Sequence, residues 1–430
     1  MPIRRLSGED LRMSKIEELK CVQCGRTYAP GAAMTCSDCG LEGILEVRYG
    51  PDARFSAADL AGRPRDLWRY RELLPVELSA SGSTGGGLVP PDLQVGWTPV
   101  YDAVHLAEYL GMRRLWVKDD GRNPTASFKD RASAIAVLAA RQAGATTVAC
   151  ASTGNAASSL AGFAAATGLA AIIFVPERAP EPKVAQLTMF GARVLKVQDN
   201  YDRTWDLCQQ ACGEFGWYNR NAAVNPYLVE GKKTAGLEIA EQLGEDLPDW
   251  IAVSVGDGCT IAGIWKGLVE MHRLGLAPRL PRLLGVQAEG ARAVADAFAR
   301  GEDLVVGGDD TVADSIAVGH PRNWRRAVRA VRESGGAFVC VSDEEILDAM
   351  RHLARKAAVF AEPAAAASLA GLGRALRDGV LSPRDTALAM VTGNGLKDTK
   401  SAIRAAGGPT AIAPRLEAVA EALGTAGHQA

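Results

Sequence analysis

One lysine stands where its amine could act as a nucleophile. The segment NPTASFKDR, residues 123–131, follows an apolar run and opens a helix-like pattern, so Lys129 would lie in the first helical turn. The partial positive charge of a helix N-terminus lowers the pKa of an amine placed there. A neutral lysine amine can form an imine with a carbonyl group. A solvated lysine paired with Asp130 explains this segment equally well when the segment is taken alone.

Three further loops carry small, hydroxyl and amide side chains at points where apolar runs end. They read ASTGNAA at 151–157, GDGCT at 256–260 and TGNGLKD at 392–398. Backbone N–H groups at a helix start attract anions, and glycine lets the backbone approach a phosphate closely. Each loop by itself is also typical of an ordinary helix start or cap. The glycine-rich loop matches neither a Walker A loop nor a dinucleotide-binding fingerprint.

Four of the nine cysteines form two C-x-x-C pairs, each followed by glycine, with 11 residues between the pairs. They are Cys21, Cys24, Cys36 and Cys39. This is the pattern of a zinc ribbon, and four thiolates leave no open coordination position, so a zinc ion here would be structural. A redox pair or unpaired surface thiols are the alternatives. Four other cysteines lie in apolar-periodic segments and are expected in the core, namely Cys150, Cys208, Cys212 and Cys340.

Composition excludes several classes of protein. The 430 residues are 47% hydrophobic and 23% charged, with a formal net charge of −2, so no overall field recruits nucleic acid or an anionic membrane. The first residues, MPIRRLSGEDLRM, contain no apolar signal region, so we expect a cytoplasmic location without disulfides. Residues 156–175 carry no charge, but glycine and hydroxyl residues divide them. They read as a helix, a turn and a buried strand and not as a membrane span.

The elements that must position these loops are buried strands alternating with alanine-rich helices. Such alternation predicts an α/β fold with parallel sheets and helices on both faces. Ligands bind such sheets at the carboxyl ends of the strands, where all four loops would lie. A flexible linker is expected at 79–92. The predicted strands are 115–118, 147–151, 171–175, 193–197, 250–255, 283–287, 337–341 and 387–391.

In this order and spacing, the four loops resemble the threonine synthase family, which are fold-type II enzymes that use pyridoxal 5′-phosphate (PLP). The resemblance runs from about residue 70 to about 423 and includes VNPYLVEGKKTAG and FAEPAAAAS. It implies a tryptophan synthase β-like fold of two parallel-sheet domains, with a small zinc ribbon before them. The expected domains are 1–50 for the ribbon, 65–127 with 240–430 for the larger PLP-binding domain, and 128–239 for the smaller domain.

The resemblance also implies residue roles. Lys129 carries PLP as a Schiff base and, once freed, serves as general base at the substrate Cα, while Phe128 flanks the ring. Asn155 bonds the phenolic oxygen, and Thr392 meets the pyridine nitrogen. The cofactor phosphate rests on Gly256, Asp257, Gly258, Cys259 and Thr260. The substrate carboxylate meets Ser152, Thr153, Gly154 and Ala156.

The family's reaction implies a small amino-acid substrate, O-phosphohomoserine, which with water gives threonine and phosphate, and a homodimeric enzyme. Several positions depart from the family pattern. Ala222, Ala223 and Leu228 replace the Asn-Ser pair and the Arg that help to bind the substrate phosphate, although Lys232 and Lys233 lie nearby. Ala126 replaces a glycine, and Asp257 adds a negative charge beside a phosphate.

These departures leave two alternatives open. One is a sibling PLP enzyme that acts on another amino acid, such as a threonine/serine dehydratase or a cysteate-synthase-like β-replacement enzyme. The other is a PLP-binding or zinc-ribbon interaction protein without turnover. The complete set of Lys129, Asn155 and Thr392 argues against the second alternative.

Overall fold

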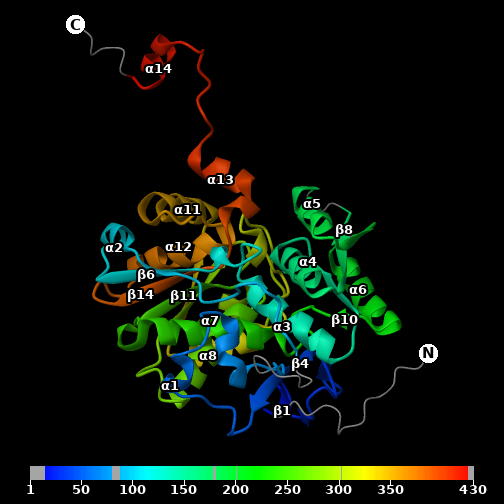
Figure 1. Cartoon of the computed structure of the whole chain (residues 1–430). Helices are drawn as coiled ribbons and strands as arrows, with labels where there is room; N and C mark the ends of the chain where they lie inside the picture. The colour runs from blue at the N-terminus through cyan, green and yellow to red at the C-terminus, as the bar shows by residue number, and fades with distance from the viewer. Residues whose placement is uncertain (1–14, 80–87, 178–180, 200, 302, 425–430) are drawn as a thin grey trace.

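The computed structural model describes residues 15–79, 88–177, 181–199, 201–301 and 303–424. The N-terminal segment from which we expect a cytoplasmic location, and most of the predicted linker, lie outside these residues. The described part contains three sheets, and helices cover the parallel sheet and the mixed sheet (Figure 1).

The largest sheet has six strands in the order β13-β12-β11-β14-β6-β5. Five of these strands run parallel and correspond to predicted apolar runs. The sixth, β5, pairs antiparallel with β6 and was not predicted, because it is a short edge strand of partly exposed residues. The strands are β5 (Val100–Asp102), β6 (Arg114–Asp119), β11 (Trp250–Ser254), β12 (Arg282–Ala288), β13 (Ala337–Val341) and β14 (Thr386–Val391).

Helices cover both faces of this sheet, as predicted. In β11, Trp250 and Ala252 belong to one apolar cluster, and Ile251 and Val253 belong to another, because successive side chains of a strand point to opposite faces. The first cluster contains buried residues of three helices, namely α2 (Val104–Leu110), α11 (Asp343–Ala357) and α12 (Pro363–Arg377). The second cluster contains buried residues of four helices, namely α7 (Leu228–Leu243), α8 (Cys259–Arg273), α9 (Ala293–Arg300) and α10 (Trp324–Glu333).

The second sheet is parallel, with the order β10-β7-β8-β9. Its strands are β7 (Thr147–Ala151), β8 (Ala170–Pro176), β9 (Arg193–Val197) and β10 (Tyr218–Asn219). Its helices are α3 (Lys129–Gln142), α4 (Asn155–Thr167), α5 (Glu181–Met189) and α6 (Tyr201–Phe215). The uncharged stretch that we interpreted as helix, turn and strand is α4, Gly168 and β8. Among the described residues, no helix has the length and apolar character needed to cross a bilayer.

The third sheet is antiparallel and lies at the N-terminal end of the described chain. Its order is β2-β1-β4-β3, with β1 (Ile16–Cys21), β2 (Thr27–Tyr28), β3 (Thr35–Cys36) and β4 (Gly40–Tyr49). We call residues 16–49 the ribbon. In Figure 1 the ribbon, in blue, lies below α7 and α8, and side-chain contacts join β4 to α8.

Short helices complete the described chain. They are α1 (Ala57–Leu60), α13 (Thr399–Ala406), α14 (Leu416–Ala422) and the 3-10 turns η1 (Leu67–Leu73), η2 (Asp120–Arg122), η3 (Gly244–Asp246), η4 (Asp314–Ile316) and η5 (Gly395–Lys397). The three sheets fall within the three predicted domain segments, and the domain boundaries themselves stay a prediction.

Candidate active site

A single cavity brings together four of the predicted segments. Lys129 and Phe128 come from the start of α3, Asn155 from the start of α4, and Thr392 from the end of β14. The whole glycine-rich turn 256–260 lines the same cavity. Segments up to 264 residues apart therefore meet at the carboxyl ends of the strands, as expected for an α/β sheet.

Backbone hydrogen bonds connect the lysine loop to the loop after β14. The Phe128 N–H donates to the Thr392 carbonyl oxygen at 2.8 Å, and the Asn394 N–H donates to the Ala126 carbonyl oxygen at 3.1 Å. Residue 126 has a φ of 63°, in the left-handed region. The chain thus turns sharply just before Lys129, which places this lysine at the first position of α3.

The Lys129 amine has a lowered pKa. Burial is the main cause, and the positive charge of Lys232 lowers the pKa further. The direction agrees with the one predicted from the helix N-terminus, but desolvation is the larger cause. A neutral amine is therefore favoured at this position.

The glycine-rich turn leaves no room for side chains at its two glycines. A Cβ on Gly256 would lie 2.9 Å from the Ile316 Cα, and a Cβ on Gly258 would lie 2.8 Å from the Asn323 carbonyl oxygen. Gly258 also has a φ of 98° and caps the N-terminus of α8. The backbone of this turn can therefore face an anion closely, as phosphate-binding loops do.

The Asp257 side chain is bound by the segment that precedes α10. Its carboxylate accepts hydrogen bonds from the Arg322 N–H at 2.7 Å and from the Asn323 Nδ2 at 2.6 Å. Its charge is thus partly offset by hydrogen-bond donors of the segment before α10, which lessens the repulsion of a phosphate that the sequence led us to expect. On the cavity wall, the buried Ser254 Oγ has no hydrogen-bond partner among the described residues. Both features fit a phosphate-bearing group in the cavity.

Sequence reasoning missed Glu362, which also lines the cavity. The Asn155 Nδ2 donates to the Glu362 Oε1 at 2.8 Å and lies 3.4 Å from the Ser315 Oγ. In the sequence, Glu362 precedes Pro363, the first residue of α12, and so looks like part of an ordinary helix start. Only the fold places this carboxylate beside Asn155.

An adjoining pocket shares Asn155, Ser315 and Glu362 with this cavity and adds Thr153 and Gly154 from the loop after β7. Ser152 and Ala156, which we also predicted to meet the substrate, are not among the residues that line either space. The Ser152 Oγ instead accepts from the Gly154 N–H at 3.2 Å. The loop therefore presents two of its four predicted residues directly.

Comparison with known proteins matches residues 92–393 to the family model described as pyridoxal-phosphate dependent enzyme. A threonine synthase from Methanosarcina acetivorans is 38% identical over 94% of this chain and 98% of its own length. The chain belongs to the threonine synthase family of PLP-dependent enzymes. A threonine synthase from Mycobacterium tuberculosis is 39% identical over 84% of this chain and 97% of its own length.

Solved structures agree on the fold. A threonine deaminase from Solanum lycopersicum matches with a TM-score of 0.62 at 21% identity, covering 72% of this chain and 88% of its own. A maize serine racemase matches with a TM-score of 0.61 at 23% identity, covering 69% and 88%. The likeness to these chains confirms the predicted fold-type II architecture.

The three positions at which apolar residues replace the expected phosphate-binding residues also have apolar surroundings. Ala222 and Leu228 pack with Ala132 and Ala136 of α3. Ala223 joins the cluster between the second sheet and α6. None of these side chains offers a hydrogen bond to a phosphate.

The two nearby lysines have different environments. The Lys233 Nζ lies 2.6 Å from Glu230 and 2.8 Å from Glu270, so its charge is already compensated inside the protein. The Lys232 Nζ instead contacts the Cys259 Sγ, on the wall of the cavity. Of the two, only Lys232 contacts a residue that lines the site.

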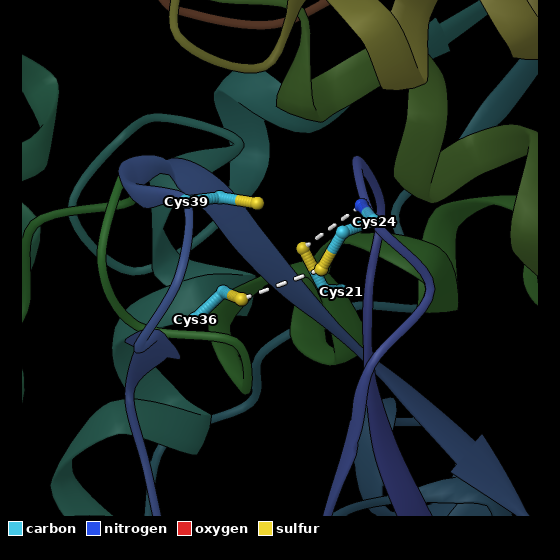
Figure 2. Close-up of side chains that lie close together, drawn as sticks. All are labelled: Cys21, Cys24, Cys36 and Cys39. Atoms are coloured by element: carbon cyan, nitrogen blue, oxygen red, sulfur yellow. Dashed lines mark hydrogen bonds between the residues drawn. The ribbon is translucent and has the colours of Figure 1, made fainter.

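The four cysteines of the ribbon converge (Figure 2). The Sγ atoms of Cys21, Cys24, Cys36 and Cys39 all lie within 4.8 Å of one another. Backbone N–H groups of Gln23 and Cys24 donate to the Cys21 Sγ at 3.4 and 3.5 Å, as expected where a tight turn presents a thiolate. This donor set and spacing fit a tetrahedral zinc site.

A tyrosine supports one thiolate of this cluster. The Tyr28 hydroxyl donates to the Cys36 Sγ at 3.2 Å, and this bond is the main reason that the pKa of the Cys36 thiol falls to about 6. A thiol that ionises readily is a better metal ligand, because the thiolate is the binding form.

Proposed function

We propose that this protein converts O-phosphohomoserine and water to threonine and inorganic phosphate. The observation that carries the proposal is the cavity in which Lys129, Asn155, the turn 256–260 and Thr392 meet, in a chain that shares 38% identity with threonine synthases over most of its length. In the overall reaction, phosphate leaves Cγ with the electrons of the C–O bond. Cγ gains a proton, and water supplies the hydroxyl that replaces a hydrogen on Cβ.

The residues of the cavity would hold PLP. Lys129 would bind its aldehyde carbon, and the turn 256–260 would hold its phosphate through backbone N–H groups. Asn155 would bond its phenolic oxygen, Thr392 its pyridine nitrogen, and Phe128 would pack against the ring. When bound, PLP supplies an electron sink through the imine that it forms with an amine.

Lys129 would also move protons. Its lowered pKa favours the neutral amine, which can accept a proton from the substrate Cα and return it during turnover. The substrate carboxylate would lie at Thr153 and Gly154, with Ser152 and Ala156 shaping the same loop. Asn155, fixed by Glu362, would keep its orientation through these steps.

The decisive assay is release of inorganic phosphate from O-phosphohomoserine by the purified holoenzyme. Lys129→Ala should abolish both this release and the visible absorbance of lysine-bound PLP, whereas Lys400→Ala, at an exposed lysine of α13, should change neither. Unchanged absorbance in Lys129→Ala would refute the assigned role of this lysine. Formation of pyruvate or 2-oxobutyrate from serine or threonine, without phosphate release from O-phosphohomoserine, would indicate a dehydratase instead.

We further propose that the four ribbon cysteines hold one structural Zn²⁺, which the convergence of their Sγ atoms supports. We also propose a cytoplasmic homodimer built from the three predicted domains, 1–50, 128–239, and 65–127 with 240–430. The resemblance to the family supports the homodimer and the three domains. Metal analysis expecting about one zinc per chain, and light scattering for the dimer, test them.

A further inference from the structure

Two buried cations near the cavity have no carboxylate partner among the described residues. Arg220 is 3% exposed and Lys232 is 1% exposed. Other buried cations in this fold show what compensation looks like. Lys118 lies 2.9 Å from Glu238, and Arg131 lies 2.6 Å from Asp120.

Arg220 reaches the helix that Lys129 begins. Its Nε and Nη2 lie 3.4 and 3.3 Å from the Ser133 Oγ, and its Nη1 makes no hydrogen bond within the described residues. Ser133 is four residues after Lys129, so both project from the same face of α3. The acid that follows Lys129, Asp130, attracts the Arg220 guanidinium but forms no ion pair with it among the described residues, and both of its oxygens accept hydrogen bonds from Thr125.

Lys232 approaches the same region from α7. Its Nζ contacts the Cys259 Sγ at the start of α8, and Cys259 lines the cavity beside Lys129. The helices α7 and α8 pack so closely here that a Cβ on Gly263 would lie 2.9 Å from the Lys232 Cβ. The lysine is thus held in place behind Cys259, a residue of the cavity wall.

An unpaired charge inside a protein costs several kcal/mol, so such groups usually bind a partner or lose their charge. Arg220 and Lys232 both lie near the cavity, and neither forms an ion pair with a carboxylate of the described residues. Their charges therefore point to an anion that a ligand brings into the cavity. Ala222, Ala223 and Leu228 pack in apolar clusters and supply no polar side chain for such an anion.

We propose that Arg220 and Lys232 are specificity-determining residues that bind the phosphate group on the side chain of the substrate. This assignment rests on the proposed function and names the part of the protein that recognises the leaving group. The same chemistry would suit the phosphate of the cofactor, because Cys259 belongs to the turn assigned to it. The experiments below separate the two sources.

Kinetics of Arg220→Gln and Lys232→Gln holoenzymes form the first test. Loss of one charge-assisted hydrogen bond should raise the KM for O-phosphohomoserine about 10- to 100-fold. The PLP content and its absorbance should stay unchanged, and Lys400→Gln should behave as wild type. An unchanged KM in both variants would overturn the proposal. Loss of PLP from Lys232→Gln would also overturn it, because that lysine would then serve the cofactor phosphate.

Binding of inorganic phosphate gives a readout that does not depend on turnover. Phosphate should raise the thermal unfolding temperature of wild-type holoenzyme and have less effect on the Arg220→Gln/Lys232→Gln double variant. An equal effect on both would overturn the proposal. If wild type fails to release phosphate from O-phosphohomoserine but inorganic phosphate still stabilises it through these two residues, the anion site stands and the proposed reaction does not.

Stability distinguishes a ligand role from a structural one. Without phosphate, Lys232→Gln should unfold at the same temperature as wild type or higher, because it removes an uncompensated buried charge. Lys118→Gln is the matched control and should unfold at a lower temperature, because it strips Glu238 of one partner. A loss of stability in Lys232→Gln as large as in Lys118→Gln would indicate a structural role and contradict the proposal.

Discussion

Ala126 illustrates how single residues shape the site. Its φ of 63° lies in the left-handed region, where a Cβ costs roughly 1–2 kcal/mol. The hydrogen bond from the Asn394 N–H to its carbonyl oxygen holds the turn that presents Lys129. The departure from glycine at this position, visible in the sequence, therefore has a conformational cost that only the backbone angle reveals.

Ala126→Gly should stabilise the protein by about 1 kcal/mol, because glycine adopts this backbone conformation without the Cβ penalty. Urea denaturation of the holoenzyme measures the change. Ala126→Val is the matched control and should lower stability, since a β-branched side chain fits this region poorly. Equal stability of all three proteins would contradict the strain inferred here.

The lowered pKa of Lys129 predicts how PLP binds to apoenzyme at different pH. Only the neutral amine attacks the aldehyde, so the rate should fall as pH decreases through the lowered pKa, with a midpoint below 10.5, the ordinary lysine value. Lys232→Gln removes a positive neighbour and should move this midpoint upward. The growth of visible PLP absorbance after mixing gives the rate, and a midpoint at or above the ordinary value would refute the prediction.

At the scale of elements, the local pattern of apolar residues predicted most of the strands that position the site. Runs such as TVACA and ALAMV became the buried strands β7 and β14, because parallel strands covered on both faces are apolar throughout. The loops after them carried the site. The three-residue edge strand β5 gave no such signal, because it is short and partly exposed.

The features of the site that could not be predicted from the sequence depend on contacts between segments that are far apart in the chain. Glu362 meets Asn155 across 207 positions of the chain, and its local context resembles a helix start. In the sequence, Arg220 and Lys232 look like ordinary charged residues. The fold shows that both are buried and that neither forms an ion pair with a carboxylate among the described residues. Spacing predicted the convergence of the cysteines, because each pair needs only one tight turn.

The strand β4 attaches the ribbon through charge. Burial opposes ionisation of Glu46, but Arg326, Lys266 and Arg329 outweigh it and hold the pKa of this carboxyl at about 2. The Arg329 Nη2 lies 2.6 Å from the Glu46 Oε1. Because the folded-state pKa is depressed, the stabilisation is present above the unfolded value near 4.5 and is lost as pH falls towards 2.

Glu46→Gln should therefore destabilise the protein at pH 7 by about 3 kcal/mol, because it leaves buried arginine charge without its carboxylate. The difference from wild type should shrink as pH falls from 4.5 towards 2, where wild type loses the same charge. Urea denaturation at several pH values checks this. Glu17→Gln, at an exposed position of β1, is the control and should show little difference at any pH.

At the scale of the whole molecule, the ribbon supports the helices that carry the site. The Lys266 Nζ of α8 donates to the Val47 carbonyl oxygen at 2.7 Å, and the Gly31 N–H donates to the Tyr227 hydroxyl at 3.0 Å, just before α7. Arg326 of α10 donates to the Leu45 carbonyl oxygen. The segment before α10 in turn holds Asp257, so the ribbon and the glycine-rich turn share one support.

Removal of the proposed zinc ion should therefore affect the binding of the proposed cofactor as well as the ribbon. After treatment with a chelator, we expect a lower unfolding temperature and weaker retention of PLP during dialysis, because α8 and α10 lose a packed neighbour. A Cys21→Ser/Cys24→Ser variant should show both effects without chelator and no further change with it. Full PLP retention and unchanged stability after complete zinc loss would contradict this coupling.

The attachment of the ribbon has a consequence for biosynthesis. Leu45 and its partner Arg326 are separated by 281 positions, so the ribosome completes the ribbon long before its docking helix exists. At ~5–20 residues per second, this interval lasts on the order of 15–60 s. During that time the nascent ribbon exposes the face that later contacts α8 and α10. Early binding of the proposed metal ion would let the ribbon sheet fold before α8 and α10 have been synthesised.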